Sequence, residues 1–192
     1  MGNALRKEDV ETSYTYADYK EWELKEGERY ELIHGVAYAM AAPNDLHQAI
    51  LTELLTQFHT YLRGKPCKVR PAPYDVRLFY EDDESDKTVV QPDISVICDK
   101  EKRGPEGCRG APDFAVEILS PSNTAIEMEL KFQLYRDAGV REYWVVNPVH
   151  KTVNTYLFAE GATRFNAYTA TDKVKVGIFP DFAVDLDSVF AE

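Results

Sequence analysis

Two runs of strand length constrain the fold of this chain more than any other feature, because both are apolar on both faces. The first is VVQPDISVI (residues 89–97) and the second is DFAVEIL (residues 113–119). A strand exposed on one face alternates apolar and polar residues, whereas a strand covered on both faces reads as a nearly continuous apolar run. We therefore expect these two runs to be central strands of a sheet with structure packed on both sides.

Helical periodicity appears in three further segments. Residues 44–63 repeat apolar side chains at steps of three and four, and Gly64 stands where a C-cap belongs. A second long helix is expected over residues 124–138, and Thr15 can cap a shorter helix over residues 16–25. These segments supply the helices that cover a sheet.

The remaining strand signals are shorter. A His34-Gly35 turn between two strand-like runs predicts a tight hairpin, and residues 74–80 alternate as a half-buried strand does. Further strands are expected at residues 141–146, 151–158 and 164–170, before a last helical turn in the tail. The order hairpin, helix, strands, helix, strands predicts an α/β fold of the α+β kind with a mixed sheet.

Length and composition predict one ordinary globular domain. The chain has 192 residues, and we expect residues 14–192 to form a single domain after a polar N-terminus, residues 1–13, that can be disordered. This N-terminus lacks the apolar core of a signal peptide, and no apolar run approaches the ~20 residues of a membrane span. Because the three cysteines, Cys67, Cys98 and Cys108, form no CxxC pair, we expect reduced thiols in a cytoplasmic protein.

The charge balance restricts how the chain can meet nucleic acid. Its 33 acidic and 22 basic residues give a net charge of −11. Non-specific DNA binding depends on neutralisation of phosphates by Lys and Arg, so a chain of this charge needs a basic strip, specific contacts or metal ions. The acidic stretch at residues 81–87 indicates a solvated loop rather than a metal site.

Two carboxylates, Asp93 and Glu117, lie inside the apolar strand runs. An unpaired carboxylate in a packed interior is costly. Two of them about 4 Å apart repel by about 4 kcal/mol at an effective dielectric of 20, and a divalent cation between them removes that cost. Magnesium suits such a pair. The alternative is that both residues lie at strand ends, solvated or paired with Lys or Arg, and Pro92 does indicate a strand start at Asp93.

The second long helix adds an amine to this pair. Glu127 and Lys131 are four residues apart and share a helix face, which is consistent with a surface ion pair. Alternatively, Lys131 turns toward the carboxylates, where it can orient or deprotonate a water and offset developing charge. The preceding SPSN run (residues 120–123) can cap the helix through its side chains or face a phosphate with its backbone amides.

An ordered set of motifs resembles a known family. The motifs are YELIHG (residues 30–35), QPDISVI, VEILSPSN, Glu127-x-x-x-Lys131-x-x-x-Tyr135, and GVREYWVVNP (residues 139–148). In this combination they resemble the Uma-two family of restriction endonucleases, which is part of the PD-(D/E)XK nuclease superfamily. The resemblance implies a restriction-endonuclease-like core with an N-terminal helix and a β-hairpin.

The resemblance also implies roles for particular residues. Asp93 would be the aspartate of the PD motif and Glu117 the acid of (D/E)XK, both ligating Mg²⁺, or Mn²⁺ in its place, with Ile118 as a further ligand residue. The element here ends in leucine, so the resemblance implies that Lys131 replaces the usual lysine from the following helix. Glu31, in the hairpin, would be a further acidic site residue unless it is an ordinary solvent-facing strand glutamate.

Other residues fit the family pattern without a defined role. His47 and Gln48 begin the first long helix, and Glu127 stands where an aspartate is more usual. The candidate nucleic-acid contacts are Lys65, Lys68, Arg70, Arg77, Ser120 and Ser122, with the loop of residues 100–109.

The resulting hypothesis is a magnesium-dependent endonuclease acting on nucleic acid, with DNA as the expected substrate, as a cytoplasmic homodimer. Two alternatives stay open. One is a nuclease-fold domain that has lost activity and serves interaction or regulation, which the acidic charge favours. The other is a metal-dependent hydrolase of small phosphoesters.

Overall fold

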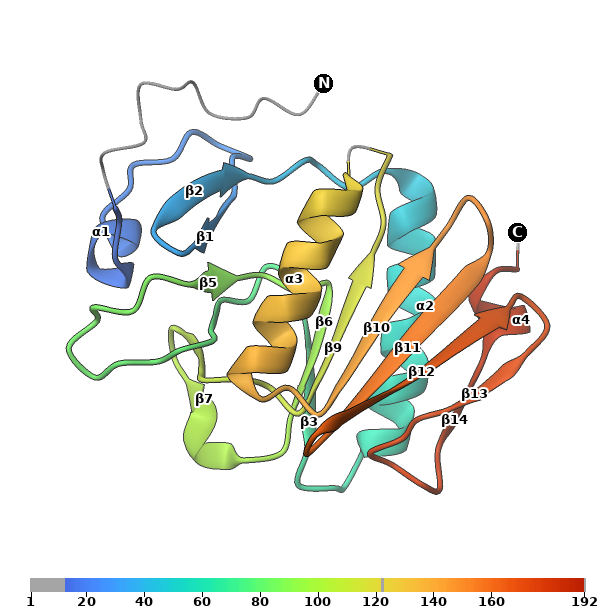
Figure 1. Ribbon diagram of the computed structural model, residues 1–192. Coiled ribbons are helices and arrows are strands. Elements are labelled where there is room, and N and C mark those ends of the chain that lie inside the picture. The colour runs from blue at the N-terminus through green and yellow to red at the C-terminus, as the bar shows by residue number, and fades with distance from the viewer. Residues whose placement is uncertain (1–12, 122, 192) are drawn as a thin grey trace.

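The computed structural model describes residues 13–121 and 123–191, so the predicted disordered N-terminus lies almost entirely outside the described residues (Figure 1). Two six-stranded sheets form the framework, with a small two-stranded ribbon beside them. The first sheet has the order β2-β1-β5-β4-β8-β7. Its strands are β1 (Tyr30–Ile33), β2 (Val36–Ala39), β4 (Val76–Arg77), β5 (Val89–Val90), β7 (Arg103–Gly104) and β8 (Gly107–Arg109).

The second sheet has the order β12-β11-β10-β9-β6-β3 and is mixed, because β9 and β10 are parallel while its other neighbours are antiparallel. Its strands are β3 (Lys68–Pro71), β6 (Ile94–Ile97), β9 (Phe114–Ile118), β10 (Glu142–Asn147), β11 (Thr152–Ala159) and β12 (Ala162–Thr169). The ribbon pairs β13 (Lys173–Lys175) with β14 (Ala183–Asp185) and leads into α4 (Leu186–Val189). The α+β fold with a mixed sheet is therefore confirmed.

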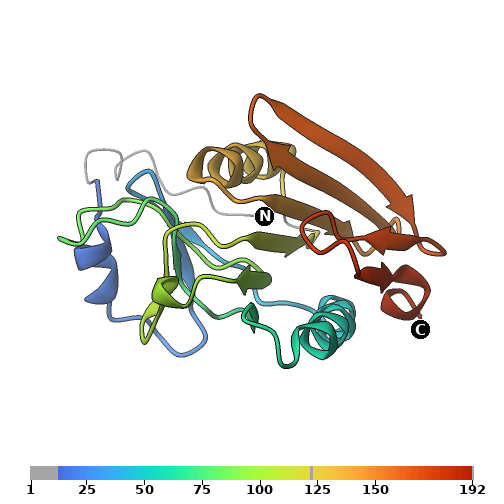
Figure 2. The same ribbon diagram turned by 90° about the horizontal axis from the view of Figure 1, so that it is seen from below.

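Two helices cover opposite faces of the second sheet, as Figure 2 shows for α2 (Asp45–Leu62) and α3 (Ala125–Ala138). Phe114 and Val116 of β9 pack in the cluster that contains the apolar side of α2. Ala115, between them, packs with Leu134 of α3. Alternate side chains of a strand point to opposite faces, so β9 is a central strand covered on both sides, as its apolar run predicted.

The run VVQPDISVI is divided between the two sheets, which corrects the expectation of one continuous strand. Val89 and Val90 pair within the first sheet, whereas β6 begins at Ile94 in the second. Gln91 and Pro92 lie between them. Proline has no N–H to donate to a strand ladder, so Pro92 occupies the break and Asp93 stands directly before β6.

The predicted long helices are confirmed, and the first short one is wrong in length. The side chain of Thr124 caps α3, and Gly139 ends it in the left-handed conformation with φ of +91°. Thr15 caps α1 as expected, but α1 spans only Tyr16–Lys20. Beyond it the ring of Trp22 packs 5.2 Å from that of Tyr19, which draws the chain back onto the helix.

The segment expected as a strand over residues 74–80 contains only the two residues of β4. Arg77 is buried there, and its guanidinium forms an ion pair with Asp86, with Nε 3.0 Å from Oδ2. Asp86 belongs to the acidic stretch that was expected to be solvated, yet it is also buried. A buried charge needs a partner of opposite sign, and these two residues supply each other.

The expectation of three reduced thiols is wrong, because Cys67 and Cys98 form a disulfide. The two cysteines lie just outside the paired residues Lys68 and Ile97 of β3 and β6, so the antiparallel register places them opposite each other. Cys108 is free and buried, and burial raises the pKa of its thiol to about 12.

No helix within the described residues is long and apolar enough to cross a membrane.

Candidate active site

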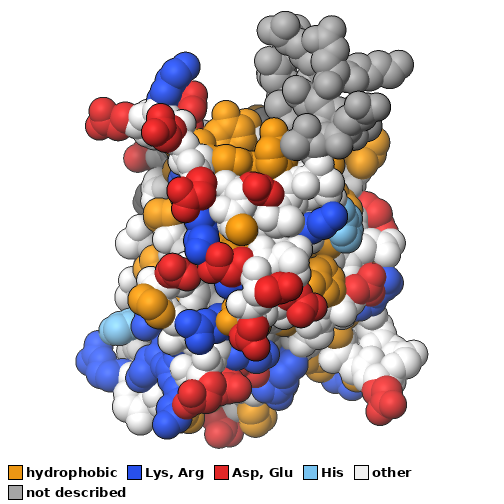
Figure 3. All heavy atoms as spheres, turned by 90° about the vertical axis from the view of Figure 1, so that its left-hand side faces the viewer, with side chains coloured by type: hydrophobic (Ala, Val, Ile, Leu, Met, Phe, Trp, Pro, Cys, Tyr) orange, Lys and Arg blue, Asp and Glu red, His pale blue; other side chains and the backbone are white. Residues whose placement is uncertain are grey.

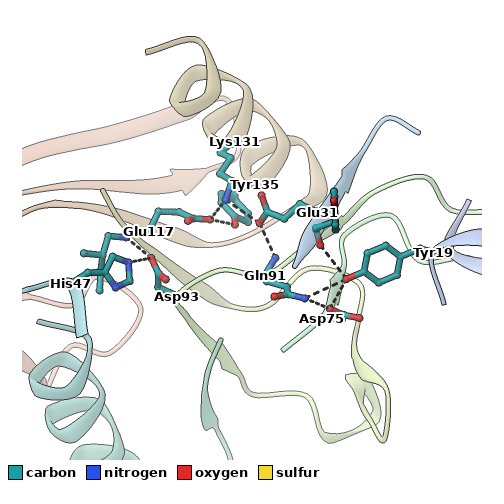
Figure 4. Close-up of polar contacts among 11 residues, drawn as sticks. Tyr19, Glu31, His47, Asp75, Gln91, Asp93, Glu117, Lys131 and Tyr135 are labelled. Carbon is teal, nitrogen blue, oxygen red and sulfur yellow. Dashed lines mark hydrogen bonds and ion pairs between the residues drawn. The ribbon is translucent and has the colours of Figure 1, made fainter. Parts of the chain in front are cut away.

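A cavity of about 440 Å³ lies where the first sheet meets the second. Its floor contains Glu31 from β1, Asp93 from the start of β6 and Glu117 from β9, with His47 from α2 and Lys131 from α3 (Figure 4). The floor therefore collects charged side chains from five elements of the fold.

Strand register brings the two predicted metal-binding carboxylates together. Ile94 of β6 is opposite Val116 of β9 in an antiparallel pair, so the preceding Asp93 comes opposite the following Glu117. Alternation along β9 turns Glu117 to the α3 side, whereas Asp93 lies just before β6 and its carboxylate contacts His47 of α2. The Asp93 carboxylate also accepts a 2.7 Å hydrogen bond from the backbone N–H of Ile118.

The Lys131 ammonium points toward Glu117 and Glu31. It therefore belongs to the carboxylate cluster and not to a surface ion pair with Glu127. Its Nζ lies 2.9 Å from Oε1 of Glu117 and 3.0 Å from Oε1 of Glu31. Burial lowers the pKa of Lys131, but the two carboxylates outweigh that effect and raise it above its usual value. Lys131 is therefore an ammonium at neutral pH, suited to orienting and offsetting negative charge rather than to removing a proton from water.

Glu127 does not form the surface ion pair with Lys131 that helical spacing allowed. Its carboxylate accepts a 2.8 Å hydrogen bond from the backbone N–H of Thr124 and completes a capping box at the start of α3. Asn123, considered above as a cap, instead accepts a hydrogen bond from the backbone N–H of Ser120. All of these except Thr124 line the cavity wall, so the cap and the cavity share one stretch of chain.

Glu117 is buried close to two other carboxylates, those of Glu31 and Asp93. Burial, opposed by Lys131 and reinforced by Glu31 and Asp93, raises the pKa of its carboxyl to about 7. The hydroxyl of Tyr135 donates a 2.6 Å hydrogen bond to Oε1, the same oxygen that Lys131 contacts. Among the described residues no hydrogen bond reaches Oε2. One oxygen of Glu117 is thus fixed by the protein, and the other is available to a ligand.

His47 is a site residue, whereas Gln48 is not. Nε2 of His47 lies 3.3 Å from Oδ2 of Asp93. Burial lowers the pKa of His47, but the Asp93 carboxylate and a backbone group of Ile118 outweigh that effect and raise the pKa above its usual value. Gln48 is exposed on α2 and lies outside the cavity lining.

A second group of polar residues holds Glu31 in place. The backbone N–H of Gln91 donates a 2.9 Å hydrogen bond to Oε1 of Glu31. The side-chain amide of Gln91 donates to Asp75 at 2.8 Å and to the Tyr19 hydroxyl at 3.3 Å (Figure 4). Sequence reasoning assigned these residues no role, and it assigned none to Tyr135, although the spacing of four from Lys131 places the two on one helix face.

The predicted phosphate contacts do not gather at this site. Lys68 pairs with Ile97, at the opposite end of β6 from Asp93, roughly 13 Å away along the strand. The loop of residues 100–109 leaves from that same far end, where Figure 3 shows most Lys and Arg side chains of that face. The Arg70 guanidinium bonds the carbonyl of its neighbour Val69.

The four other candidate nucleic-acid contacts lie in different places. Lys65 is exposed and lies over the ring of Tyr61, with Nζ 3.1 Å from the ring centroid. Arg77 is buried in its pair with Asp86 and is not a surface contact. Ser120 does line the cavity, and Ser122 lies outside the described residues.

The donor set fits a hard cation of the magnesium type. Within the described parts of the chain, no group of three His, Cys, Asp or Glu side chains converges on a single metal position. The candidate ligands are therefore the carboxylates of Asp93 and Glu117 and the backbone carbonyl of Ile118. Mg²⁺ is commonly held by one or two carboxylates and completes its shell with water and substrate phosphate.

Comparison with known proteins agrees with this fold. A protein-family model described as "Uma2: Putative restriction endonuclease" matches residues 16–187. The Synechocystis protein slr1290 is 28% identical over 172 residues, covering 88% of each chain. The crystal structure of a "putative nuclease belonging to DUF820" from Anabaena variabilis superposes with a TM-score of 0.72 at 20% identity, covering 93% of this chain and 98% of the other. This chain belongs to the Uma2 family.

Proposed function

We propose that this member of the family is a magnesium-dependent endonuclease that hydrolyses phosphodiester bonds of DNA. The observation that carries the proposal is the imbalance of charge in the cavity floor. Glu31 and Glu117 share the single ammonium of Lys131, and the third carboxylate, of Asp93, lies beside His47. Like charges this close destabilise one another unless a cation joins them, and burial together with Glu31 and Asp93 raises the pKa of Glu117 to about 7.

Asp93, Glu117 and the Ile118 carbonyl would hold the cation. When bound, it supplies Lewis-acid polarisation of the scissile phosphate and activation of the attacking water. Lys131, fixed between Glu117 and Glu31, would orient that water and offset the negative charge that develops on the phosphate. Tyr135 and Gln91 would keep the two glutamates in register with the ammonium.

The proposal extends to the products and the assembly. Attack on phosphorus with loss of the 3′ oxygen leaves a 5′-phosphate and a 3′-hydroxyl. A homodimer would provide one site for each strand of a duplex, and the expected location is the cytoplasm. The acidic net charge agrees with a site that depends on cations rather than on a broad basic surface.

Cleavage of DNA with and without Mg²⁺ tests the proposal. Wild type and Asp93→Asn would be incubated with supercoiled plasmid and with labelled single-stranded DNA, in Mg²⁺ or in EDTA. We expect cleavage by wild type in Mg²⁺ alone and loss of at least about 100-fold in the variant, because a metal-binding carboxylate is removed. Glu101→Gln, which changes an exposed carboxylate far from the cavity, should cleave as wild type does.

Three results would overturn the proposal. Equal cleavage by wild type and Asp93→Asn would remove Asp93 from the mechanism. Absence of cleavage with every nucleic acid, together with absence of Mg²⁺ binding, would favour a silent interaction domain. Hydrolysis of bis(p-nitrophenyl) phosphate without cleavage of any nucleic acid would assign the site to small phosphoesters.

A further inference from the structure

We propose that the cavity binds one unpaired nucleotide of a DNA strand, with its base on the ring of Tyr38 and its phosphate directed toward Asp93 and Glu117. This inference rests on the proposed function, and it specifies the form of DNA that the site accepts. The observations behind it are the position of Tyr38, the apolar wall beside it, and the scarcity of free cations around the cavity.

Tyr38 stands beside the carboxylate floor because of strand register. It is directly opposite Glu31 in the antiparallel pair of β1 and β2. Side chains of opposite residues in such a pair point to the same face, with Cβ atoms about 4.5–5.5 Å apart. Tyr38 lines the cavity, is 38% exposed, and its ring makes no ring contact with another aromatic side chain in the described chain.

The wall of the cavity beside Tyr38 is apolar. It runs from Tyr38 through residues 39–43, which include Met40 and Pro43. The other wall is the first half of α3, where Leu130 lines the cavity between Glu127 and Lys131. Against the apolar wall a planar base can stack, because every base has a π-face and stacking does not depend on sequence.

The size of the cavity matches one nucleotide unit rather than a double helix. Its volume of about 440 Å³ lies within the range of small-ligand sites, roughly 300–1,000 Å³. A base pair buried in a stacked duplex cannot offer its face to Tyr38, so the nucleotide has to come from a single strand or be turned out of the helix.

Charge around the cavity also disfavours a duplex. Four acidic residues line it, while its cations are Lys131, already bonded to two carboxylates, and Arg29. Within the described ranges Arg29 makes no ion pair, so it is free to contact one phosphate. Duplex binding without base readout depends on many neutralised phosphates. Here the affinity must come from stacking and from the cation site.

Binding measurements can test the inference without relying on cleavage. Fluorescence anisotropy would follow a labelled 12-nucleotide DNA, single-stranded or annealed to its complement, at low salt with Ca²⁺ in place of Mg²⁺. We expect the single strand to bind at least about tenfold more tightly than the duplex. Tyr38→Ala should weaken single-strand binding about fivefold or more, the effect of losing one stacked base, whereas Tyr38→Phe should retain it.

Phe165→Ala provides the matched control, since it also removes an exposed aromatic ring from an edge strand, but away from the cavity. Its single-strand binding should equal that of wild type. Equal affinity for single strand and duplex, or equal loss in Tyr38→Ala and Phe165→Ala, would overturn the inference. If either result appears while cleavage still requires Mg²⁺ and Asp93, the inference fails and the proposed nuclease function stands.

Discussion

Two buried clusters of charged side chains differ in whether their positive and negative charges are equal in number. The difference distinguishes a cluster that stabilises the fold from one that can bind a ligand. Arg77 and Asp86 form a one-to-one pair, with side chains 8% and 0% exposed. In the cavity floor, Glu31 and Glu117 share the Lys131 ammonium, Asp93 lies beside His47, and Glu117 has a raised pKa. A balanced buried pair holds a loop to the core, whereas an unbalanced one leaves negative charge for a cation and a phosphate to use.

The largest expected effect breaks the balanced pair. Asp86→Asn leaves the Arg77 guanidinium buried without its counter-charge, so we expect a loss of about 3–5 kcal/mol in the free energy of unfolding, measured by urea denaturation. Glu84→Gln removes the exposed pair with Lys20 and should cost less than about 1 kcal/mol. Cleavage per folded Asp86→Asn molecule should be unchanged. A loss of stability no larger than that of Glu84→Gln would contradict the structural role.

In the cavity floor, removing one carboxylate charge should change the stability of the protein little, unlike the loss of Asp86. Glu117→Gln removes one of three negative charges but keeps an oxygen for Lys131 and Tyr135, so stability without cation should change by less than about 1 kcal/mol. In wild type, Mg²⁺ at 100 times its dissociation constant should add about 2.7 kcal/mol, and the variant should lose this gain. Thermal melts with Mg²⁺ and with EDTA measure both. A variant as strongly stabilised by Mg²⁺ as wild type would show that Glu117 is not a ligand.

Acidity gives a smaller test of the same cluster. Since the pKa of Glu117 is raised to about 7, a proton competes with the cation below that pH. The apparent Mg²⁺ affinity should therefore fall by up to about tenfold for each pH unit below 7 and level off above it. Calorimetric titration between pH 6 and pH 8 measures the slope. An affinity that rises as the pH falls would exclude the carboxylate as the competing group.

The smallest effect is expected far from the cavity. Lys68→Ala removes a cation at the opposite end of β6, where Nζ donates a hydrogen bond to the carbonyl of Lys65. Cleavage and single-strand binding should change by less than about twofold at 0.1 M salt. Arg29→Ala, at the cavity, should weaken binding several-fold under the same conditions. A larger loss from Lys68→Ala than from Arg29→Ala would place the DNA path along the far end of the sheet.

The sequence by itself determined the elements and the residues that carry the charge. Helical spacing and end caps located α2 and α3, and the two apolar runs identified buried strands, with Glu117 inside β9 and Asp93 directly before β6. These signals are local, since caps and periodicities act within a few residues. The family resemblance added Glu31 and the displaced lysine, which spacing alone left undecided.

Tertiary structure alone decided which charges meet. Lys131 reaches Glu31 across 100 residues of sequence, Arg77 turns inward to Asp86, and Cys67 pairs with Cys98. Each contact depends on strand register or on the packing of separate elements, which no local pattern encodes. The same holds for the basic residues expected to contact phosphate, because only strand register places Lys68 at the end of β6 far from Asp93, and only packing buries Arg77 against Asp86.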